Sequence, residues 1–198
     1  MLEVKDATIQ VGERTLVKGF SMLAKDGALT CITGPQGSGK TTLLRTLMGF
    51  LPVKEGFVSV DGELLTIHSA HAFRQMMVYL PQEMQALRHQ LLPPEAPVCE
   101  VEEYGVWNKM LPSVKPEQPA APLSPEEIFQ LARETILAAK DKPIVIADEP
   151  AALLPSDLSL RMLELLRRQA EAGKTVLIAS RKPQMVAYAD LVINLETC

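Results

Sequence analysis

The sequence predicts an α/β fold: a mostly parallel sheet, an antiparallel β lobe at the N-terminus and a small helical insert. Two continuous apolar strands, at 144–147 and 175–179, are typical of a parallel sheet that is buried on both faces. A third apolar strand, at 28–33, runs directly into a glycine-rich turn and then a helix. The chain has 198 residues and is 47% hydrophobic, so we expect a single domain over residues 1–198.

The other elements are predicted from periodicity and turn residues. Apolar and polar residues alternate over residues 2–11, which predicts strands near the N-terminus, with turn signals at Gly12-Glu13 and Gly27. Further along the chain we expect a helix at 43–51, strands at 56–62 and 77–80, a helix from Ser124, a helix from 156 or 157 to 173, and a last strand within 187–195.

Prolines set one segment apart. They crowd residues 91–125, at positions 93, 94, 97, 112, 116, 119, 122 and 125. Such density precludes long uninterrupted helices and central strands. We therefore expect a short helix near 98–110 followed by an extended linker, while a partly disordered loop accounts equally well for residues 112–122.

Charge and hydropathy exclude several classes of protein. The formal net charge is −4, without a long block of either sign, so we expect no nucleic acid partner. No apolar run approaches the roughly 20 residues that span a bilayer, and the first residues do not resemble a targeting peptide. The sequence thus predicts a cytoplasmic protein that reaches a membrane only through a partner.

Cysteine and histidine give no metal pattern. Cys31, Cys99 and Cys198 are widely spaced, and Cys31 is expected to be a buried strand residue. His68 and His71 lie three residues apart, but without a third ligand nearby a solvated face is the better interpretation.

The glycine-rich turn fits the pattern G-x-x-x-x-G-K-[ST] over residues 34–41, between a strand and a helix. Its glycines allow backbone N–H groups to surround phosphate oxygens, Lys40 neutralises the β- and γ-phosphates, and the Thr41 hydroxyl can bind Mg²⁺. The residues expected to bind the nucleotide here are Gly34, Pro35, Gln36, Gly37, Ser38, Gly39, Lys40, Thr41 and Thr42.

Two acids follow the apolar strand at 144–147, at the end of the strand where ligands bind in parallel sheets. Asp148 can hold the shell of a Mg²⁺ ion, and Glu149 can orient or deprotonate an attacking water. Because they follow a complete phosphate-binding loop in the same chain, these acids predict a site for phosphoryl transfer.

Three stretches, GPQGSGKTTLLRTLMG, YLPQ and VIADEP, resemble the Walker A, Q-loop and Walker B motifs of ABC-type ATPases, in the same order. The resemblance covers nearly the whole chain and implies a P-loop NTPase fold that binds ATP and Mg²⁺. It implies that Gln82 contacts Mg²⁺ and the attacking water. It also implies that residues 83–140 form a helical, proline-rich subdomain that touches a membrane permease subunit.

Four features depart from the family's pattern. Val11 matches the position of an aromatic residue that stacks on adenine; we expect it to pack against the base of the nucleotide, although valine offers no π-face. The signature motif is replaced by residues 123–127, Leu-Ser-Pro-Glu-Glu, which make a good helix start. The loop at 151–155 lacks the usual aspartate, and Arg181 matches the switch histidine.

The predicted function is therefore an ATP-binding subunit that drives or gates a membrane transporter, with Glu149, Gln82 and Lys40 as catalytic residues. Its metal ligands would be Thr41, Gln82 and Asp148. A first alternative is a degenerate subunit that binds ATP but scarcely hydrolyses it and pairs with a competent ABC subunit. The expected partners are a membrane permease subunit and a second ABC ATPase subunit, in a homodimer or a heterodimer. A second alternative is an ABC-type ATPase without a permease. If the first of these predictions holds, the protein is peripheral at the inner face of the membrane, where a partner holds it.

Overall fold

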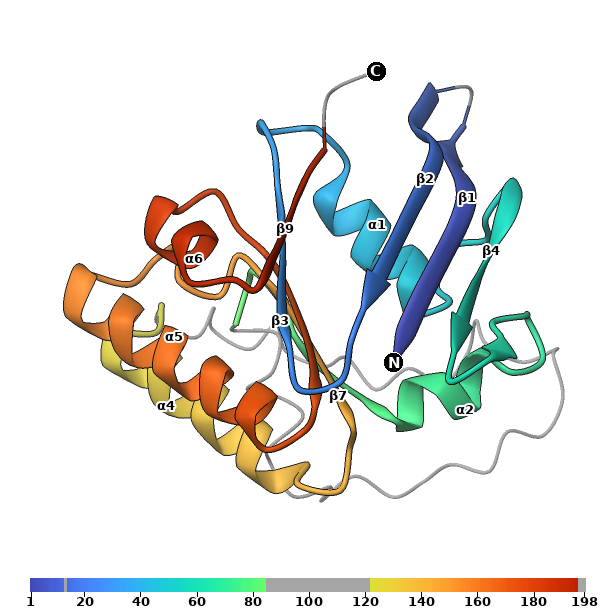
Figure 1. Ribbon diagram of the computed structural model, residues 1–198. Helices are drawn as coiled ribbons and strands as arrows, with labels where there is room; N and C mark the ends of the chain where they lie inside the picture. The colour runs from blue at the N-terminus through green and yellow to red at the C-terminus, as the bar shows by residue number, and fades with distance from the viewer. Residues whose placement is uncertain (13, 85–121, 196–198) are drawn as a thin grey trace, which may run out of the picture.

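Two sheets organise the protein, as the sequence predicts (Figure 1). The computed structural model describes residues 1–12, 14–84 and 122–195. A parallel sheet has the order β6-β7-β8-β3-β9, and an antiparallel sheet of N-terminal strands has the order β2-β1-β4-β5. The strands of the parallel sheet are β3 (Leu29–Thr33), β6 (Met77–Leu80), β7 (Ile144–Asp148), β8 (Thr175–Ala179) and β9 (Leu191–Asn194); those of the antiparallel sheet are β1 (Leu2–Val11), β2 (Arg14–Ala24), β4 (Glu55–Val60) and β5 (Glu63–Leu64).

The layers explain why the central strands are mostly apolar and do not alternate with polar residues. Helices α4 (Pro125–Ala138) and α5 (Ser156–Glu171) pack on one face of the parallel sheet, and α1 (Lys40–Leu47) lies on the other face, on the side of the antiparallel sheet (Figure 1). In β7, Val145 faces the core with α4 and α5, whereas Ile146 faces the core with α1. Both faces are buried, so alternation is absent.

The predicted helix from Ser124 is confirmed, together with its cap. The Ser124 hydroxyl accepts a hydrogen bond from the Glu127 backbone N–H at 3.3 Å, and the Glu127 carboxylate accepts one from the Ser124 N–H at 2.8 Å. Pro125 occupies the first position of α4, where a missing N–H costs nothing. These contacts satisfy donors at the start of the helix that would otherwise have no partner.

The helix predicted at 43–51 has different bounds. Helix α1 begins at Lys40, directly after the glycine-rich turn, and ends at Leu47. It ends because Gly49 adopts φ 73°, and the N–H groups of Gly49 and Phe50 turn back to the carbonyls of Thr46 and Arg45. This is the usual way that a glycine terminates a helix.

Several short elements were not predicted: β5, α2 (Ala70–Gln75) and α6 (Pro183–Ala187). The predicted short helix near 98–110 and its linker lie outside the described residues. Of the predicted subdomain at 83–140, the described part consists mainly of α4. Within the residues that the structure places, no helix is both long enough and apolar enough to cross a membrane.

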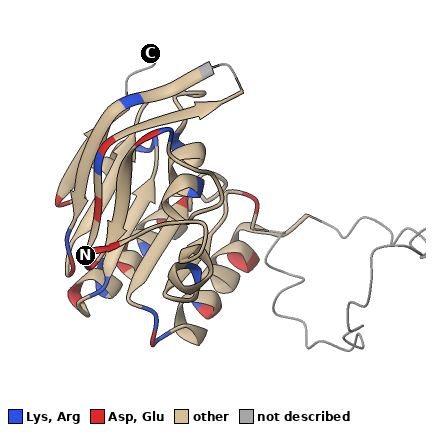
Figure 2. Cartoon of the chain, turned by 90° about the vertical axis from the view of Figure 1, so that its right-hand side faces the viewer, with Lys and Arg blue, Asp and Glu red and all other residues tan. Residues whose placement is uncertain are grey.

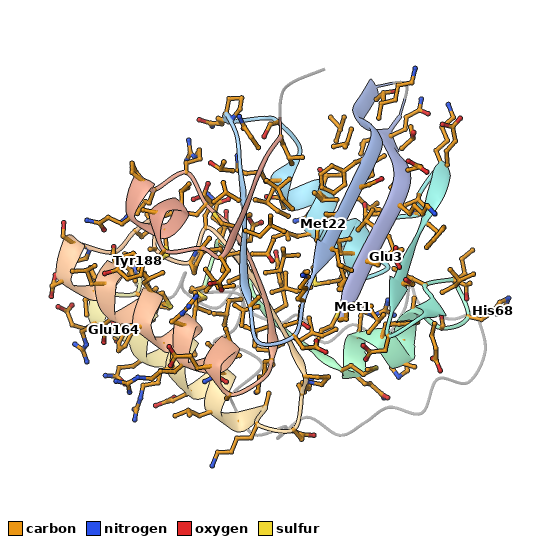
Figure 3. All side chains as sticks on the ribbon, viewed as in Figure 1. Met1, Glu3, Met22, His68, Glu164 and Tyr188 are labelled. Atoms are coloured by element: carbon orange, nitrogen blue, oxygen red, sulfur yellow. The ribbon has the colours of Figure 1, made fainter. Side chains whose placement is uncertain are left out.

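The polar surface agrees with the composition. Acidic and basic residues are interspersed along the chain in the cartoon of Figure 2. His68 points away from the body of the protein (Figure 3), and both His68 and His71 are exposed. Cys31 is buried in β3. No group of three or more potential metal ligands of the His, Cys, Asp or Glu type occurs in the parts of the chain that are described.

Candidate nucleotide-binding site

The loops that carry the sequence motifs meet at one edge of the parallel sheet. Strands β6, β7, β8 and β3 are neighbours and run in the same direction, so the residues that follow them lie close together. They enclose a cavity of about 270 Å³. Its lining consists of Leu16, Gln36, Gly37, Gly39, Lys40, Thr41, Thr42, Gln82, Asp148, Glu149 and Arg181.

The glycine-rich turn is shaped by close backbone contacts. Gly34 has φ 147°, and a β-carbon there would collide with the carbonyl oxygen of Leu195 and approach the Ser38 hydroxyl at 2.9 Å. Gly39 has φ 91°, in the left-handed region, and sits immediately before α1. Both conformations favour glycine, so the loop depends on residues that have no side chain.

Lys40 is held against the loop that precedes it. Its ammonium group donates to the carbonyl oxygens of Gly34 and Pro35, at 2.9 Å each, and only 7% of the residue is exposed. Burial lowers the pKa of Lys40, partly offset by the nearby Glu149 carboxylate. A phosphate group can replace these neutral carbonyl acceptors with charged oxygens, which make stronger hydrogen bonds with an ammonium group.

Asp148 fits a divalent cation. The residue is 1% exposed, and its Oδ1 makes no hydrogen bond within the described part of the chain. Burial raises the pKa of this carboxyl group, while a hydrogen bond from the Thr41 side chain works in the opposite direction. Carboxylate and hydroxyl oxygens are the ligands that Mg²⁺ prefers, so Asp148 and Thr41 together suit that ion.

Glu149 and Arg181 form an ion pair beside these groups. The Arg181 Nε lies 3.0 Å from the Glu149 Oε1, and the Arg181 backbone N–H donates to Oε2 at 3.3 Å. Glu149 is 7% exposed and has φ 46°, an uncommon conformation for a residue with a side chain. The lining of the cavity therefore includes two basic residues, Lys40 and Arg181, and two acidic residues, Asp148 and Glu149.

Some predicted residues lie apart from the cavity lining. Val11, at the end of β1, is 49% exposed and does not line the cavity, so its contact with a base stays a prediction. Gly34, Pro35 and Ser38 belong to the turn but are not part of the lining. Residues 123–127, which replace the signature, do not line it either; they form the start of α4.

Sequence reasoning missed Leu16 and the surroundings of Asp148. Leu16, on β2, lines the cavity and contacts Gly39, but a leucine in an alternating strand carries no signal of this role. Tyr79, on β6, lies beside Asp148 and Arg45, and burial, followed by the Asp148 charge, raises the pKa of its hydroxyl to about 12. Its place on the strand next to β7 could have suggested this contact.

Comparison with known proteins gives a family. The family model described as "ABC transporter" matches residues 17–152. The chain is 26% identical over 210 residues to the ABC transporter ATP-binding/permease protein Rv1747 of Mycobacterium tuberculosis, and this match covers 98% of the chain but 24% of that protein.

Two other relatives match over most of their own length. The chain is 27% identical to the cytochrome c biogenesis ATP-binding export protein CcmA of Nitrobacter winogradskyi, over 92% of both chains. It is 29% identical to the hemin import ATP-binding protein HmuV of Roseobacter denitrificans, over 96% of this chain and 78% of that protein.

Solved structures show the same fold. The ATP-binding cassette MJ0796 in its dimeric, post-hydrolysis state with ADP and Pi has a TM-score of 0.70 and 22% identity, over 99% of this chain and 94% of that chain. At this level of identity, the likeness supports the fold.

Proposed function

The chain belongs to the ABC transporter family, and on this premise we propose that it binds MgATP in the cavity described above and hydrolyses it to drive or gate a membrane transporter. One observation carries the proposal. The glycine-rich turn, Asp148, Glu149 and Gln82 come from three separate segments and line a single cavity that also contains Lys40. None of these residues alone is specific for a nucleotide, but together they form a site that fits the phosphates of a nucleotide.

Each residue has a role that follows from its chemistry. Lys40 and the N–H groups of residues 36–41 hold the β- and γ-phosphates. Thr41, Asp148 and Gln82 hold Mg²⁺, which neutralises charge on the phosphates when it is bound. Glu149 orients a water and receives its proton, while the water oxygen attaches to the γ-phosphorus and the bond to the β,γ-bridging oxygen breaks. ADP and inorganic phosphate are the products.

The proposed partners are a membrane permease subunit and a second ABC ATPase subunit, which is either another copy of this chain or a different subunit. The protein would thereby lie at the inner face of the membrane. Named relatives include one hemin import protein and one export protein, so the family offers both directions of transport. The proposal is accordingly limited to the ATP-dependent step.

A second candidate function is a subunit that binds ATP but hydrolyses it poorly. It is favoured by the start of α4, where Ser124 and Glu127 cap each other and Glu126 adds a further acid in the first turn. In the family this helix start faces the γ-phosphate bound to the opposite subunit. Acids there offset the partial positive charge that would attract a phosphate.

Binding and turnover of the purified chain separate the two candidates. Equilibrium binding of MgATP and release of phosphate are measured for the wild type, with Glu149→Gln as the control for turnover. Binding with turnover of about 1 s⁻¹, the low end for typical enzymes, supports hydrolysis by this chain. Binding without turnover beyond the control supports the second candidate. Absence of MgATP binding refutes both.

Location tests the transporter part of the proposal. A tagged chain expressed in its own cells should sediment with membranes, whereas the purified chain should not bind protein-free liposomes. A chain that stays in the soluble fraction of those cells would instead indicate an ABC-type ATPase without a permease.

A further inference from the structure

Helices α4 and α5 lie side by side on the face of the parallel sheet that points away from the antiparallel sheet (Figure 1). A groove of about 470 Å³ runs between them. It is separate from the nucleotide-binding cavity, because the two share no lining residue. The groove is lined by Phe129, Gln130, Arg133, Arg161, Glu164, Leu165 and Arg168.

Three arginines give this groove its charge. Arg133, Arg161 and Arg168 are exposed, and none of the three forms an ion pair with another residue in the described part of the chain. The neighbouring Arg167, by contrast, pairs with Asp190 at 2.7 Å. Helices α4 and α5 contain arginine and no lysine. A guanidinium group is more weakly hydrated than an ammonium group and binds a carboxylate with two parallel hydrogen bonds. The groove is therefore suited to carboxylates that another molecule supplies.

An aromatic ring holds one of these arginines in place. The guanidinium carbon of Arg161 lies 4.6 Å from the centroid of the Phe129 ring, within the range of a cation–π interaction. Phe129 is only 5% exposed, so the ring is fixed in the core between the two helices and the sheet. Arg161 thus has less freedom to lose when a partner binds, which lowers the entropic cost of binding.

The charges on α5 alternate along one face of the helix. Glu164, labelled in Figure 3, lies three residues after Arg161 and four before Arg168, so the three side chains share a face over about 10.5 Å. A compact anion offers only acceptors and would be repelled by Glu164. A second helix can place acids opposite the two arginines and a lysine opposite Glu164, as charged residues do between the helices of a coiled coil. Charge complementarity therefore favours a helix over a compact anion.

We propose that the groove between α4 and α5 is a docking surface for an acidic helix of a partner protein, in which two acidic residues flank a lysine at the spacing of Arg161, Glu164 and Arg168. The acids pair with the two arginines and the lysine pairs with Glu164, while Arg133 on α4 faces a further acid at the other wall of the groove. This surface does not depend on the nucleotide-binding function proposed above.

The test uses two designed helical peptides and the full chain. One peptide carries Glu-x-x-Lys-x-x-x-Glu on one face, and the other carries the reversed charges, Lys-x-x-Glu-x-x-x-Lys. Fluorescence anisotropy of the labelled peptides is measured at low ionic strength, where exposed charges are least screened. The wild type should bind the first peptide more tightly. The net charge of the chain, −4, favours the opposite order, so this result would reflect the groove rather than the whole protein.

Variants of the groove give the sharper test. Arg161→Gln with Arg168→Gln should weaken binding of the first peptide about tenfold, since each exposed ion pair contributes up to about fivefold. Replacement of both arginines by lysine should recover part of the loss. Glu164→Gln should weaken binding about two- to fivefold, although it makes the groove more positive. The matched control is Lys18→Gln with Lys25→Gln, which removes two exposed charges on and directly after β2 and should not change the preference between the peptides.

Several results would overturn the inference. One is equal or weaker binding of the first peptide by the wild type, and another is unchanged affinity in the arginine double variant when circular dichroism shows that it is folded. Tighter binding by Glu164→Gln would indicate a site for a compact anion, with inorganic tripolyphosphate as the probe. Binding to phosphatidylserine vesicles but to neither peptide would indicate a membrane surface. Affinity for MgATP should be the same in all these variants, and a change would show that the groove is not separate from the nucleotide site.

Discussion

Replacing Lys40 with methionine separates ATP binding from stability. The ammonium group makes two hydrogen bonds of 2.9 Å to the carbonyls of Gly34 and Pro35, and we expect phosphate oxygens to take their place when ATP binds. A hydrogen bond to a charged group contributes about 1.5–3 kcal/mol. Loss of two such bonds, less the solvation that replaces them, weakens binding by about 2.7 kcal/mol, or roughly 100-fold.

A thermal melt can measure this difference. At an ATP concentration of about 100 times its Kd, ligand binding stabilises the wild type by about 2.7 kcal/mol, whereas a variant with a 100-fold higher Kd gains about 0.4 kcal/mol. For a domain of this size, 1 kcal/mol corresponds to about 2–4 °C in Tm. MgATP should therefore raise the Tm of the wild type by about 5–11 °C and that of Lys40→Met by about 1–2 °C.

Without ATP, Lys40→Met should be at least as stable as the wild type. Burial lowers the pKa of Lys40 in the folded protein, so the charged form costs stability. This cost is fully present below the folded pKa and disappears as the pH rises past the unfolded value. At neutral pH the variant avoids it, and solvent can hydrate the carbonyls of the turn.

The control is Lys174→Met. Lys174 also donates to a backbone carbonyl, that of Ala139 at 3.2 Å, and burial also lowers its pKa, but it lies outside the cavity. This variant should keep the full shift in Tm with MgATP. A full shift in Lys40→Met, or a lost shift in Lys174→Met, would refute the assignment of the phosphates to this cavity.

Three further results are expected. Asp148→Asn should lose Mg²⁺-dependent ATP binding in calorimetry, yet it should stabilise the free protein at pH 8. Burial raises the pKa of the Asp148 carboxyl group, so the wild type loses stability as the pH rises through that pKa. The stability that the variant gains over the wild type should therefore vanish in acid. Ser124→Ala should destabilise the protein by about 1 kcal/mol in urea with ATP affinity unchanged; a loss of affinity would implicate the helix start in binding. Glu149→Gln should remain monomeric with MgATP by light scattering, and Pro125→Gly with Glu126→Gly should restore some dimer; a stable dimer without these changes would contradict the idea.

The sequence alone was sufficient to predict most of the residues that line the cavity, for a physical reason. Strands buried on both faces are recognisable from their composition, and parallel strands end at one edge of the sheet, so residues directly after them must converge. Asp148 and Glu149 could thus be placed near Lys40 without knowing any distance, whereas Gln82 was placed there by the resemblance to the family. The same reasoning predicts nothing about side chains that reach the cavity from the antiparallel sheet, and Leu16 was missed for that reason.

The sequence also did not predict contacts between two loops. Arg181 matches the family's switch histidine, but an arginine cannot serve as a neutral partner of Glu149. The structure adds that Arg181 is instead a charged partner, because the backbone after β8 brings both its N–H and its Nε to the carboxylate. Such a contact depends on the relative placement of two strand ends. Short helices such as α2 escape prediction because six residues carry little periodicity.

The start of α4 brings local stability and the family's chemistry into conflict. The N–H groups that would bind a phosphate from an opposite subunit belong to a first turn that already has Pro125, which lacks one, and Glu127, whose N–H is bonded to Ser124. The same features that stabilise the helix therefore reduce its capacity to bind an anion. A second copy of this chain would present the same capped helix to the first, so neither site would be complete. If the partner is a different ABC subunit whose helix start carries no such cap, that helix start would face this chain's Lys40 and Glu149. We expect turnover to be higher in such a pair than in a pair of two copies of this chain.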